Sequence, residues 1–181
     1  MRIFIAVDLP KEVKNYLYDL QKELQVEKKY NKINWIAKKN LHLTLRFLGD
    51  ITKEELSKVE EELERIRLNK FEAILKGTGI FPNEIIPRIV WVGLEPKEGI
   101  QKLQHKVDEL TLGIGKAEQE FSAHITLGRI KKLERKKGLL EKIKELKIKE
   151  LKWKIEKITI FESVLSKEGP KYKIIKEIVL Q

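Results

Sequence analysis

The chain has 181 residues, enough for one compact unit with a substantial apolar core. Hydrophobic residues make up 41% and charged residues 36%, which excludes a disordered or collagen-like chain, and the absence of cysteine excludes disulfides and thiolate chemistry. The 38 Lys and Arg against 28 Asp and Glu give a net charge of +10, which attracts polyanions such as nucleic acid.

The same composition also suits a heat-adapted protein, because Lys, Glu and Ile are abundant and Cys is absent, so charge alone does not establish a nucleic-acid partner. Three histidines are too few for most imidazole-rich metal sites, and we predict that the protein needs neither a metal nor another cofactor. The N-terminal apolar run is broken at Asp8, unlike a signal peptide or a membrane span. We therefore expect a cytoplasmic monomer without membrane partners.

The first half of the chain predicts alternating strands and helices. Residues 2–12, RIFIAVDLPKE, form an apolar strand pattern that ends at a proline, and a helix with one apolar face follows. The next predicted strand is LHLTLRFLGD, residues 41–50. A Thr-x-x-Glu capping box then opens a helix near 52–67, and a strand is expected near 71–78.

The second half repeats this order. Residues 88–98, RIVWVGLEPKE, match residues 2–12 at Arg, Ile, Pro, Lys and Glu without a gap, at an offset of 86. A second amphipathic helix follows, and then the strand AHITLGRI at 123–130, which shares His-x-Thr-Leu with the first half. This joint recurrence predicts a duplication, with pseudo-symmetric repeats at roughly 1–80 and 88–130.

A lysine-rich helix near 133–146 and strands near 150–163 and 172–180 complete the chain. Strands and helices that alternate in two similar halves predict the α+β class. We expect a single bilobal domain over residues 1–181, a duplicated fold in which two antiparallel-rich sheets face one another across a central cleft, with helices on the outside. The two His-x-Thr strands would line that cleft.

The two His-x-Thr strands carry the candidate catalytic residues. Because successive side chains on a strand point to opposite faces, His42 and Thr44 share one face, and His124 and Thr126 share one likewise. A pseudo-twofold axis would bring two imidazoles and two hydroxyls together around one phosphate. Phosphodiester hydrolysis needs a base and an acid, and two histidines with ordinary pKa values of about 6.5 supply both.

A single His-x-Thr would more often hold a structural histidine bonded to backbone, but two copies in matching repeats favour catalysis. The threonine hydroxyls would donate to the non-bridging phosphate oxygens in the transition state. Arg46 lies two residues beyond Thr44 and would add a charged phosphate contact if the strand stays regular. Arg129 would do so only if the strand kinks at Gly128, where a bulge is expected.

Other residues give weaker signals. His105 lies among polar residues of the second helix and has no counterpart in the first, which indicates a surface position. The basic run at 131–137 would either hold an RNA backbone or form a solvated helix face. Four aromatic residues near the motifs suit either base stacking or the core, and we assign the first and last of them to the core: Phe4, Trp35, Phe81 and Trp91.

Together, HLTLRFLGD and HITLGR resemble the motifs of the 2H phosphoesterase superfamily, most closely the branch of the 2′-5′ RNA ligases and RNA 2′,3′-cyclic phosphodiesterases. The opening RIFIAVDLP, the motif spacing and the length extend the resemblance over nearly the whole chain. The resemblance implies that His42 donates a proton to the leaving oxygen, that His124 accepts one from water, and that Thr44 and Thr126 bind phosphate.

The activity implied by this resemblance is hydrolysis of an RNA 2′,3′-cyclic phosphate end to a 2′-phosphomonoester, without metal or nucleotide. An RNA 5′-hydroxyl end would replace water in the related 2′-5′ ligation. Three alternatives stay open: a 2H phosphoesterase for small cyclic nucleotides, a non-catalytic RNA-binding module that keeps the cleft, and a heat-stable structural domain. The basic charge favours an RNA partner.

Overall fold

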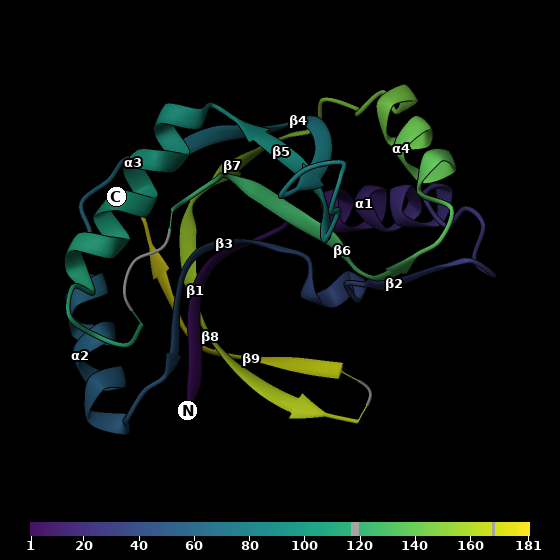
Figure 1. The fold of residues 1–181 in the computed structure, drawn as a ribbon. Coiled ribbons are helices and arrows are strands. Elements are labelled where there is room, and N and C mark those ends of the chain that lie inside the picture. Colours follow the sequence, from purple (N-terminus) through teal and green to yellow (C-terminus); the bar gives the residue numbers. More distant parts are fainter. Residues whose placement is uncertain (117–119, 168) are drawn as a thin grey trace.

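The computed structural model describes residues 1–116, 120–167 and 169–181. Within these ranges the chain forms four α-helices, one short 3-10 helix and nine strands (Figure 1). In chain order these elements are β1 Arg2–Asp8, α1 Lys11–Glu23, β2 Asn31–Trp35, η1 Lys38–Asn40, β3 His42–Asp50, α2 Lys53–Glu64, β4 Phe71–Phe81, β5 Ile89–Glu95, α3 Lys97–Leu110, β6 His124–Leu133, α4 Lys136–Glu145, β7 Lys152–Ile155, β8 Lys157–Ser166 and β9 Gly169–Val179.

The nine strands form one curled sheet with the order β7-β4-β5-β6-β3-β1-β8-β9, and β2 pairs with β6. Each of these pairings is antiparallel. The central strands β3 and β6 meet through one residue pair, Leu43 opposite Ile125, so the sheet divides there into two halves. The α+β class is confirmed, and the two expected sheets are the halves of one curled sheet.

The strands that form each half of the sheet are not consecutive in the sequence. Strand β4 pairs with β5 and β7, whereas β8 pairs with β1 and β9 pairs with β8. At Glu156 the chain leaves β7, at one edge of the sheet, and continues into β8 in the other half. Each half in space therefore combines segments that the sequence repeats at 1–80 and 88–130 keep apart.

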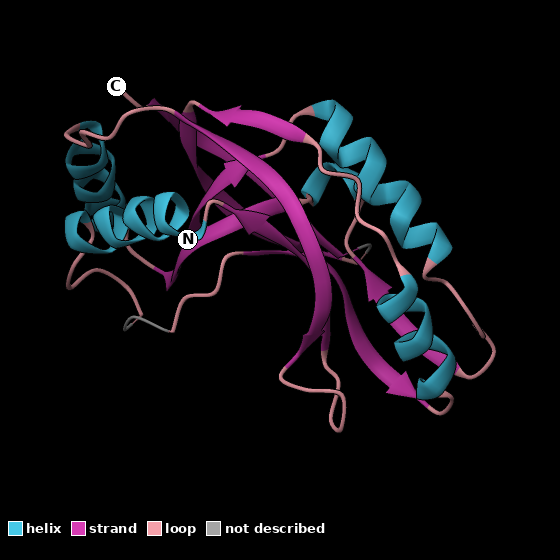
Figure 2. Cartoon of the chain, turned by 90° about the horizontal axis from the view of Figure 1, so that it is seen from above, coloured by secondary structure: helices cyan, strands magenta, loops and turns pink. Residues whose placement is uncertain are grey.

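The helices flank the sheet in two groups, α2 with α3 on one side and α1 with α4 on the other (Figures 1 and 2). Helix α3 packs against β3, and α1 contacts β6, so the first helix of each repeat lies on the histidine strand of the other repeat. Apolar side chains between sheet and helices form one large buried cluster. This packing fixes the two histidine strands relative to one another.

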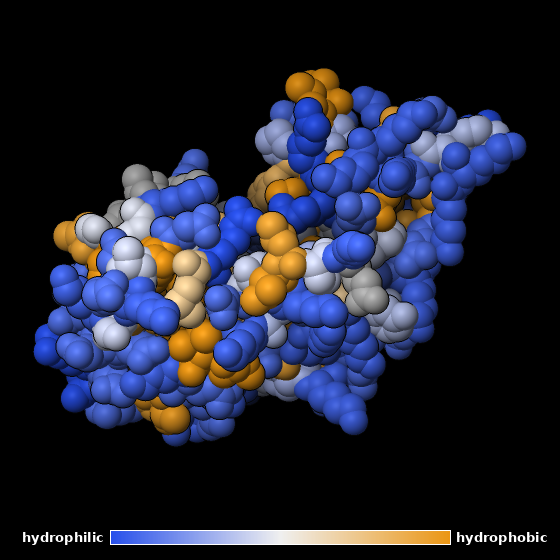
Figure 3. Space-filling view, turned by 90° about the horizontal axis from the view of Figure 1, so that it is seen from below, coloured by the Kyte–Doolittle hydropathy of each residue, from blue (hydrophilic) through white to orange (hydrophobic). Residues whose placement is uncertain are grey.

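Most predicted elements agree with the structure to within a few residues. The helix expected near 52–67 is α2, and its capping box joins Thr52 and Glu55 in both directions. Two elements, β2 and η1, have no clear signal in the sequence, because both are short and rich in polar residues. No helix in the described ranges is long and apolar enough to cross a membrane. On the face drawn in Figure 3, hydrophilic side chains predominate and hydrophobic ones form separate groups.

Candidate active site

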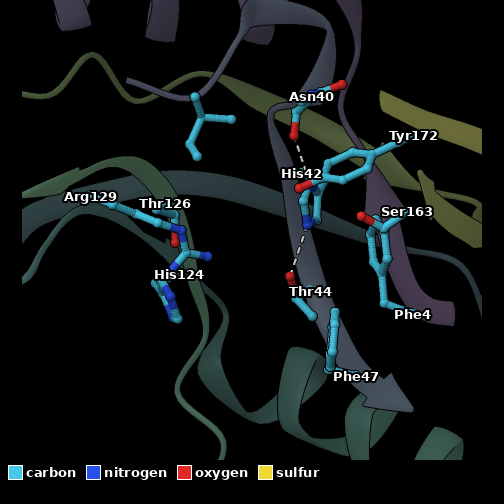
Figure 4. A pocket seen from close by; sticks show the side chains of 11 residues that line it. Phe4, Asn40, His42, Thr44, Phe47, His124, Thr126, Arg129, Ser163 and Tyr172 are labelled. Carbon is cyan, nitrogen blue, oxygen red and sulfur yellow. Dashed lines mark hydrogen bonds between the residues drawn. The ribbon is translucent and has the colours of Figure 1, made fainter. Parts of the chain in front are cut away.

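Both His-x-Thr motifs come together where the two halves of the sheet meet. His42 begins β3 and His124 begins β6, and Figure 4 shows both rings beside Thr44 and Thr126. The four side chains line a cavity of about 90 Å³, which has room for several water-sized groups. The other residues that line this pocket are Phe4, Ile36, Asn40, Phe47, Arg129, Ser163 and Tyr172.

Each imidazole is oriented by the carbonyl two residues before it. Nδ1 of His42 lies 2.6 Å from the carbonyl oxygen of Asn40, and Nδ1 of His124 lies 2.7 Å from that of Ser122. Because a carbonyl only accepts hydrogen bonds, Nδ1 carries the proton in both rings. Nε2 is therefore the nitrogen of each ring that is left to exchange protons with a substrate.

Aromatic rings pack against both histidines. The ring centroids of Phe4 and His42 are 5.0 Å apart, and the edge of Tyr172 approaches His42 at 5.4 Å. Phe81 meets His124 in a T-shaped contact at 5.0 Å. Phe4 is buried, as expected, and it also lines the pocket.

These surroundings change the acidity of both rings. Burial lowers the pKa of His42, while the Asn40 carbonyl and the Asp8 carboxylate oppose this shift. Burial likewise lowers the pKa of His124, and the Ser122 carbonyl opposes it. A lowered pKa favours the neutral ring, which is the form that accepts a proton.

The two rings differ in their charged neighbours. Asp8 lies opposite His42 in the β1–β3 ladder, whereas Gly93 lies opposite His124 in the β5–β6 ladder. The equivalent residues Asp8 and Gly93 are 85 positions apart in the sequence. The gapless alignment of residues 2–12 with 88–98 has an offset of 86, so the two strands correspond in space with a shift of one residue. The cation of Arg129 lowers the pKa of both histidines. Asp8 raises the pKa of His42, and Lys14, which is ion-paired with Asp8, lowers it; the strand position opposite His124 provides no carboxylate.

A β-bulge follows the threonine in each motif. The β1–β3 ladder skips Leu45, and the β5–β6 ladder skips Leu127, at the matching position of the repeat. Each skip reverses the face that the next side chains occupy. Phe47 and Arg129 consequently line the pocket, whereas Arg46 is directed to the other side of the sheet.

Arg46 is buried against α3. Its Nη1 donates a hydrogen bond of 2.8 Å to Oδ1 of Asp108, and its Nη2 lies 3.4 Å from the carbonyl oxygen of Lys116. The phosphate contact predicted for Arg46 depended on a regular strand, and the bulge removes that condition. In this structure Arg46 connects β3 to α3 and to the segment that follows α3.

The second bulge has its own supports. The buried amide of Gln21 donates hydrogen bonds of 2.8 Å to the carbonyl oxygens of Leu127 and Ile36. A Cβ atom added to Gly128 would lie 2.9 Å from Cε3 of Trp35, so glycine is needed for β2 to pack there. The kink predicted at this glycine is present, and Arg129 lines the pocket as the prediction required.

Several pocket residues were missed by the sequence analysis, among them Asn40, Ser163 and Tyr172. Ser163 lies on β8, which pairs with β1, and Tyr172 lies on β9, which pairs with β8; no local pattern indicates this placement. The Asn40 amide donates a 2.8 Å hydrogen bond to the Pro170 carbonyl, which holds β9 against the pocket. Within the described ranges, no group of three or more His, Cys, Asp or Glu could hold a metal ion.

The chain is similar to known proteins over nearly its whole length. Residues 7–91 and 92–172 each match the sequence model of LigT like Phosphoesterase. The RNA 2′,3′-cyclic phosphodiesterase of Archaeoglobus fulgidus is 30% identical over 180 residues, which cover 96% of this chain and 97% of that protein. The protein of the same name from Thermotoga maritima is 32% identical over 180 residues, covering 98% and 94% of the two chains.

A solved structure agrees over the full length. The protein TT0787 of Thermus thermophilus superposes with a TM-score of 0.79 at 31% identity, over 99% of this chain and 98% of that chain. The two consecutive family matches leave only short terminal segments uncovered, and they divide the chain into two similar parts, as a duplication requires. The chain therefore belongs to the LigT-like phosphoesterases, the family of the 2H phosphoesterases that its two histidine motifs resemble.

Proposed function

We propose that this protein is an RNA 2′,3′-cyclic phosphodiesterase that converts the cyclic end of an RNA strand to a 2′-phosphomonoester. The observation that carries the proposal is the meeting of His42 and His124 in one cavity, each with Nδ1 bonded to a carbonyl, so that Nε2 is the nitrogen that exchanges a proton; Nε2 of His42 also bonds the Thr44 hydroxyl. The names of relatives about 30% identical over nearly the whole chain support the same substrate.

The reaction needs one proton acceptor and one proton donor. Nε2 of His124 takes a proton from water as the water oxygen bonds to phosphorus. The bond between phosphorus and the 3′-oxygen breaks, and Nε2 of His42 gives its proton to that oxygen. The phosphate stays on the 2′-oxygen, and proton exchange with solvent resets the two rings. Each transfer typically contributes about 10²- to 10⁴-fold to the rate.

The unlike surroundings of the two rings support this assignment of roles. Asp8 faces His42 and favours its protonated form, which a donor must have before reaction, while burial and the Lys14 ammonium paired with Asp8 oppose it. When protonated, His42 Nε2 donates to the Thr44 hydroxyl 2.9 Å away, and the hydroxyl hydrogen of Thr44 is then free to bind a phosphate oxygen.

Three further groups would stabilise the phosphate and its nucleoside. Thr44 and Thr126 would donate to the non-bridging oxygens, and Arg129 would add a charged contact from the wall opposite His42 (Figure 4). Phe47 is 39% exposed at the rim, where its ring would stack on the terminal base. No step requires a metal ion or a nucleotide cofactor.

An RNA 5′-hydroxyl would replace water as the nucleophile, since both lose one proton to His124. This substitution gives a 2′-5′ linkage and makes ligation the related reaction of the same site. A single chain supplies both histidines, and we propose that the active form is a monomer that meets RNA in the cytoplasm.

The decisive assay uses a short RNA with a 2′,3′-cyclic phosphate end and excess chelator. We expect a 2′-phosphomonoester, identified by chromatography against 2′- and 3′-phosphate standards. A 3′-phosphate would contradict the assigned leaving oxygen, and no turnover would refute the function and favour a binding module. A kcat/KM that is much higher for mononucleotide 2′,3′-cyclic phosphates than for RNA would favour the small-nucleotide alternative.

A further inference from the structure

A basic groove lies beside the pocket, behind the segment 36–40. Its volume is about 860 Å³, and its lining includes four lysines, one tyrosine and one carboxylate: Lys11, Lys14, Lys38, Lys39, Tyr18 and Asp8. Ile36 and Asn40 line the pocket, while the three residues between them line the groove. One short segment therefore forms the wall between groove and pocket.

The lysines of the groove have two different roles. Lys14 is 15% exposed, and its Nζ lies 2.6 Å from Asp8 and 3.1 Å from the Lys39 carbonyl oxygen, so this side chain braces the wall. Lys11, Lys38 and Lys39 are exposed. Three lysine side chains thus line the groove up to the pocket wall. The one carboxylate in the lining, Asp8, is ion-paired with Lys14.

An aromatic ring lies among these cations. Tyr18 is 39% exposed, and the Nζ atom of Lys38 lies 5.6 Å from its ring centroid; Lys22, which is outside the groove and ion-paired with Asp19, approaches the ring at 4.4 Å. Lysines interleaved with an exposed aromatic ring are typical of surfaces that bind single-stranded nucleic acid, in which phosphates contact cations and bases or riboses contact the ring.

The basic run 131–137 is less suited to a polyanion. In the run 131–137, ion pairs join Lys132 to Glu134, Arg135 to Glu27 and Lys137 to Glu141. A phosphate would have to compete with these carboxylates. Of the two interpretations that the sequence left open for this run, the solvated face therefore fits better. The groove is the stronger candidate for binding the RNA backbone.

We propose that the groove binds the phosphates of single-stranded RNA on the 5′ side of the cyclic end; this inference rests on the proposed function. Asn40 and Phe47 lie toward opposite ends of the pocket (Figure 4), because Asn40 precedes His42 along the chain and Phe47 follows it by five residues. With its terminal base on Phe47, the RNA leaves past Asn40 and enters the groove.

The test combines Lys11→Gln, Lys38→Gln and Lys39→Gln in one variant. A matched control combines Lys53→Gln, Lys58→Gln and Lys102→Gln, which removes three exposed lysines from α2 and α3 on the other side of the molecule. Binding of a single-stranded RNA of about ten nucleotides, ending in 2′-phosphate, is measured by fluorescence anisotropy at several salt concentrations. Hydrolysis of mononucleotide 2′,3′-cyclic AMP, which reaches only the pocket, is measured in parallel.

We expect the groove variant to bind the RNA at least about tenfold more weakly at 0.1 M salt. The slope of log affinity against log salt should fall by about 2, because each lost phosphate contact on a single strand contributes about 0.7. Hydrolysis of the mononucleotide should be unchanged, and the control should match the wild type in both measurements. Equal RNA binding by wild type and groove variant, or equal losses in groove variant and control, would overturn the proposal.

The design also separates this inference from the proposed function. A wild-type protein that hydrolyses neither this mononucleotide nor an RNA with a 2′,3′-cyclic phosphate end would refute the function, and the anisotropy series would still decide whether RNA occupies the groove. A groove variant that loses mononucleotide hydrolysis as strongly as RNA binding would overturn the groove proposal, because the wall would then be acting on the pocket itself.

Discussion

Replacing either motif arginine by methionine should separate a structural role from a role in binding. The Arg46 side chain is 6% exposed and Asp108 is 15% exposed, and their ion pair is 2.8 Å long. Removing one partner of a buried pair costs about 3–5 kcal/mol. Asp108 retains the amide of Gln104 and some solvent, so we expect Arg46→Met to lower the free energy of unfolding by about 2–3 kcal/mol.

Arg129→Met is the matched comparison. Arg129 is exposed at the pocket, so its loss should change stability by less than about 0.5 kcal/mol. It should lower kcat/KM by about 10²-fold, as expected for a lost transition-state contact. Arg46→Met, measured on the folded enzyme, should stay within about threefold of wild type, an effect below that of one such lost contact.

Urea unfolding followed by tryptophan fluorescence gives the stabilities, and hydrolysis of mononucleotide 2′,3′-cyclic AMP gives kcat/KM. An Arg46→Met variant that kept wild-type stability and lost as much activity as Arg129→Met would refute the placement of Arg46 away from the pocket. That result would mean that β3 continues as a regular strand and directs Arg46 at the phosphate.

Four further outcomes follow from the pocket and its supporting strands. Because burial lowers the pKa of both His42 and His124, the pH profile of kcat/KM should peak below about 6.5, and a peak well above neutrality would contradict this. The same shift means that the unfolded chain binds more protons, so stability should fall as pH drops below about 6.5, and less so in His42→Gln. Gly128→Ala should cost about 1–3 kcal/mol in urea unfolding, because its Cβ would press on Trp35; an unchanged midpoint would argue against the close packing. Phe47→Ala should raise KM for RNA with little change in kcat, and an unchanged KM would show that the terminal base does not stack on Phe47.

The positions of the histidines and threonines were predictable from two periodicities. Alternation along a strand places His42 with Thr44 and His124 with Thr126, and the internal repeat predicts that the two pairs face one another. The structure has all four in one pocket. These inferences needed only local geometry and the assumption that duplicated sequence gives duplicated structure.

Alternation failed one residue beyond each threonine, where the strand bulges. In β6 the bulge could be expected, because Gly128 marks a place where no side chain fits. In β3 the matching position is Arg46, which suits a regular strand equally well, and the bulged strand directs it to its partner Asp108 on α3. A contact between residues so distant in sequence leaves no local signal, and for the same reason Phe47 was overlooked.

The far wall of the pocket was beyond sequence reasoning. Ser163 and Tyr172 belong to strands that join the first half of the sheet, although the repeat suggested only that they close the chain. Their position depends on the passage of the chain from one half of the sheet to the other at Glu156, and on which edge strand is free to pair with β8. Strand order of this kind is decided by the packing of the whole domain rather than by the pattern of any one segment.

The central claim is that two histidines act together as acid and base without a metal. The most direct measurement compares kcat of the wild type, His42→Ala, His124→Ala and the double variant on cyclic-ended RNA in excess chelator, with circular dichroism to confirm folding. The account predicts full wild-type turnover, a loss of about 10²- to 10⁴-fold in each single variant, and little further loss in the double variant. Turnover that survives either substitution, or wild-type turnover that the chelator abolishes, would contradict it.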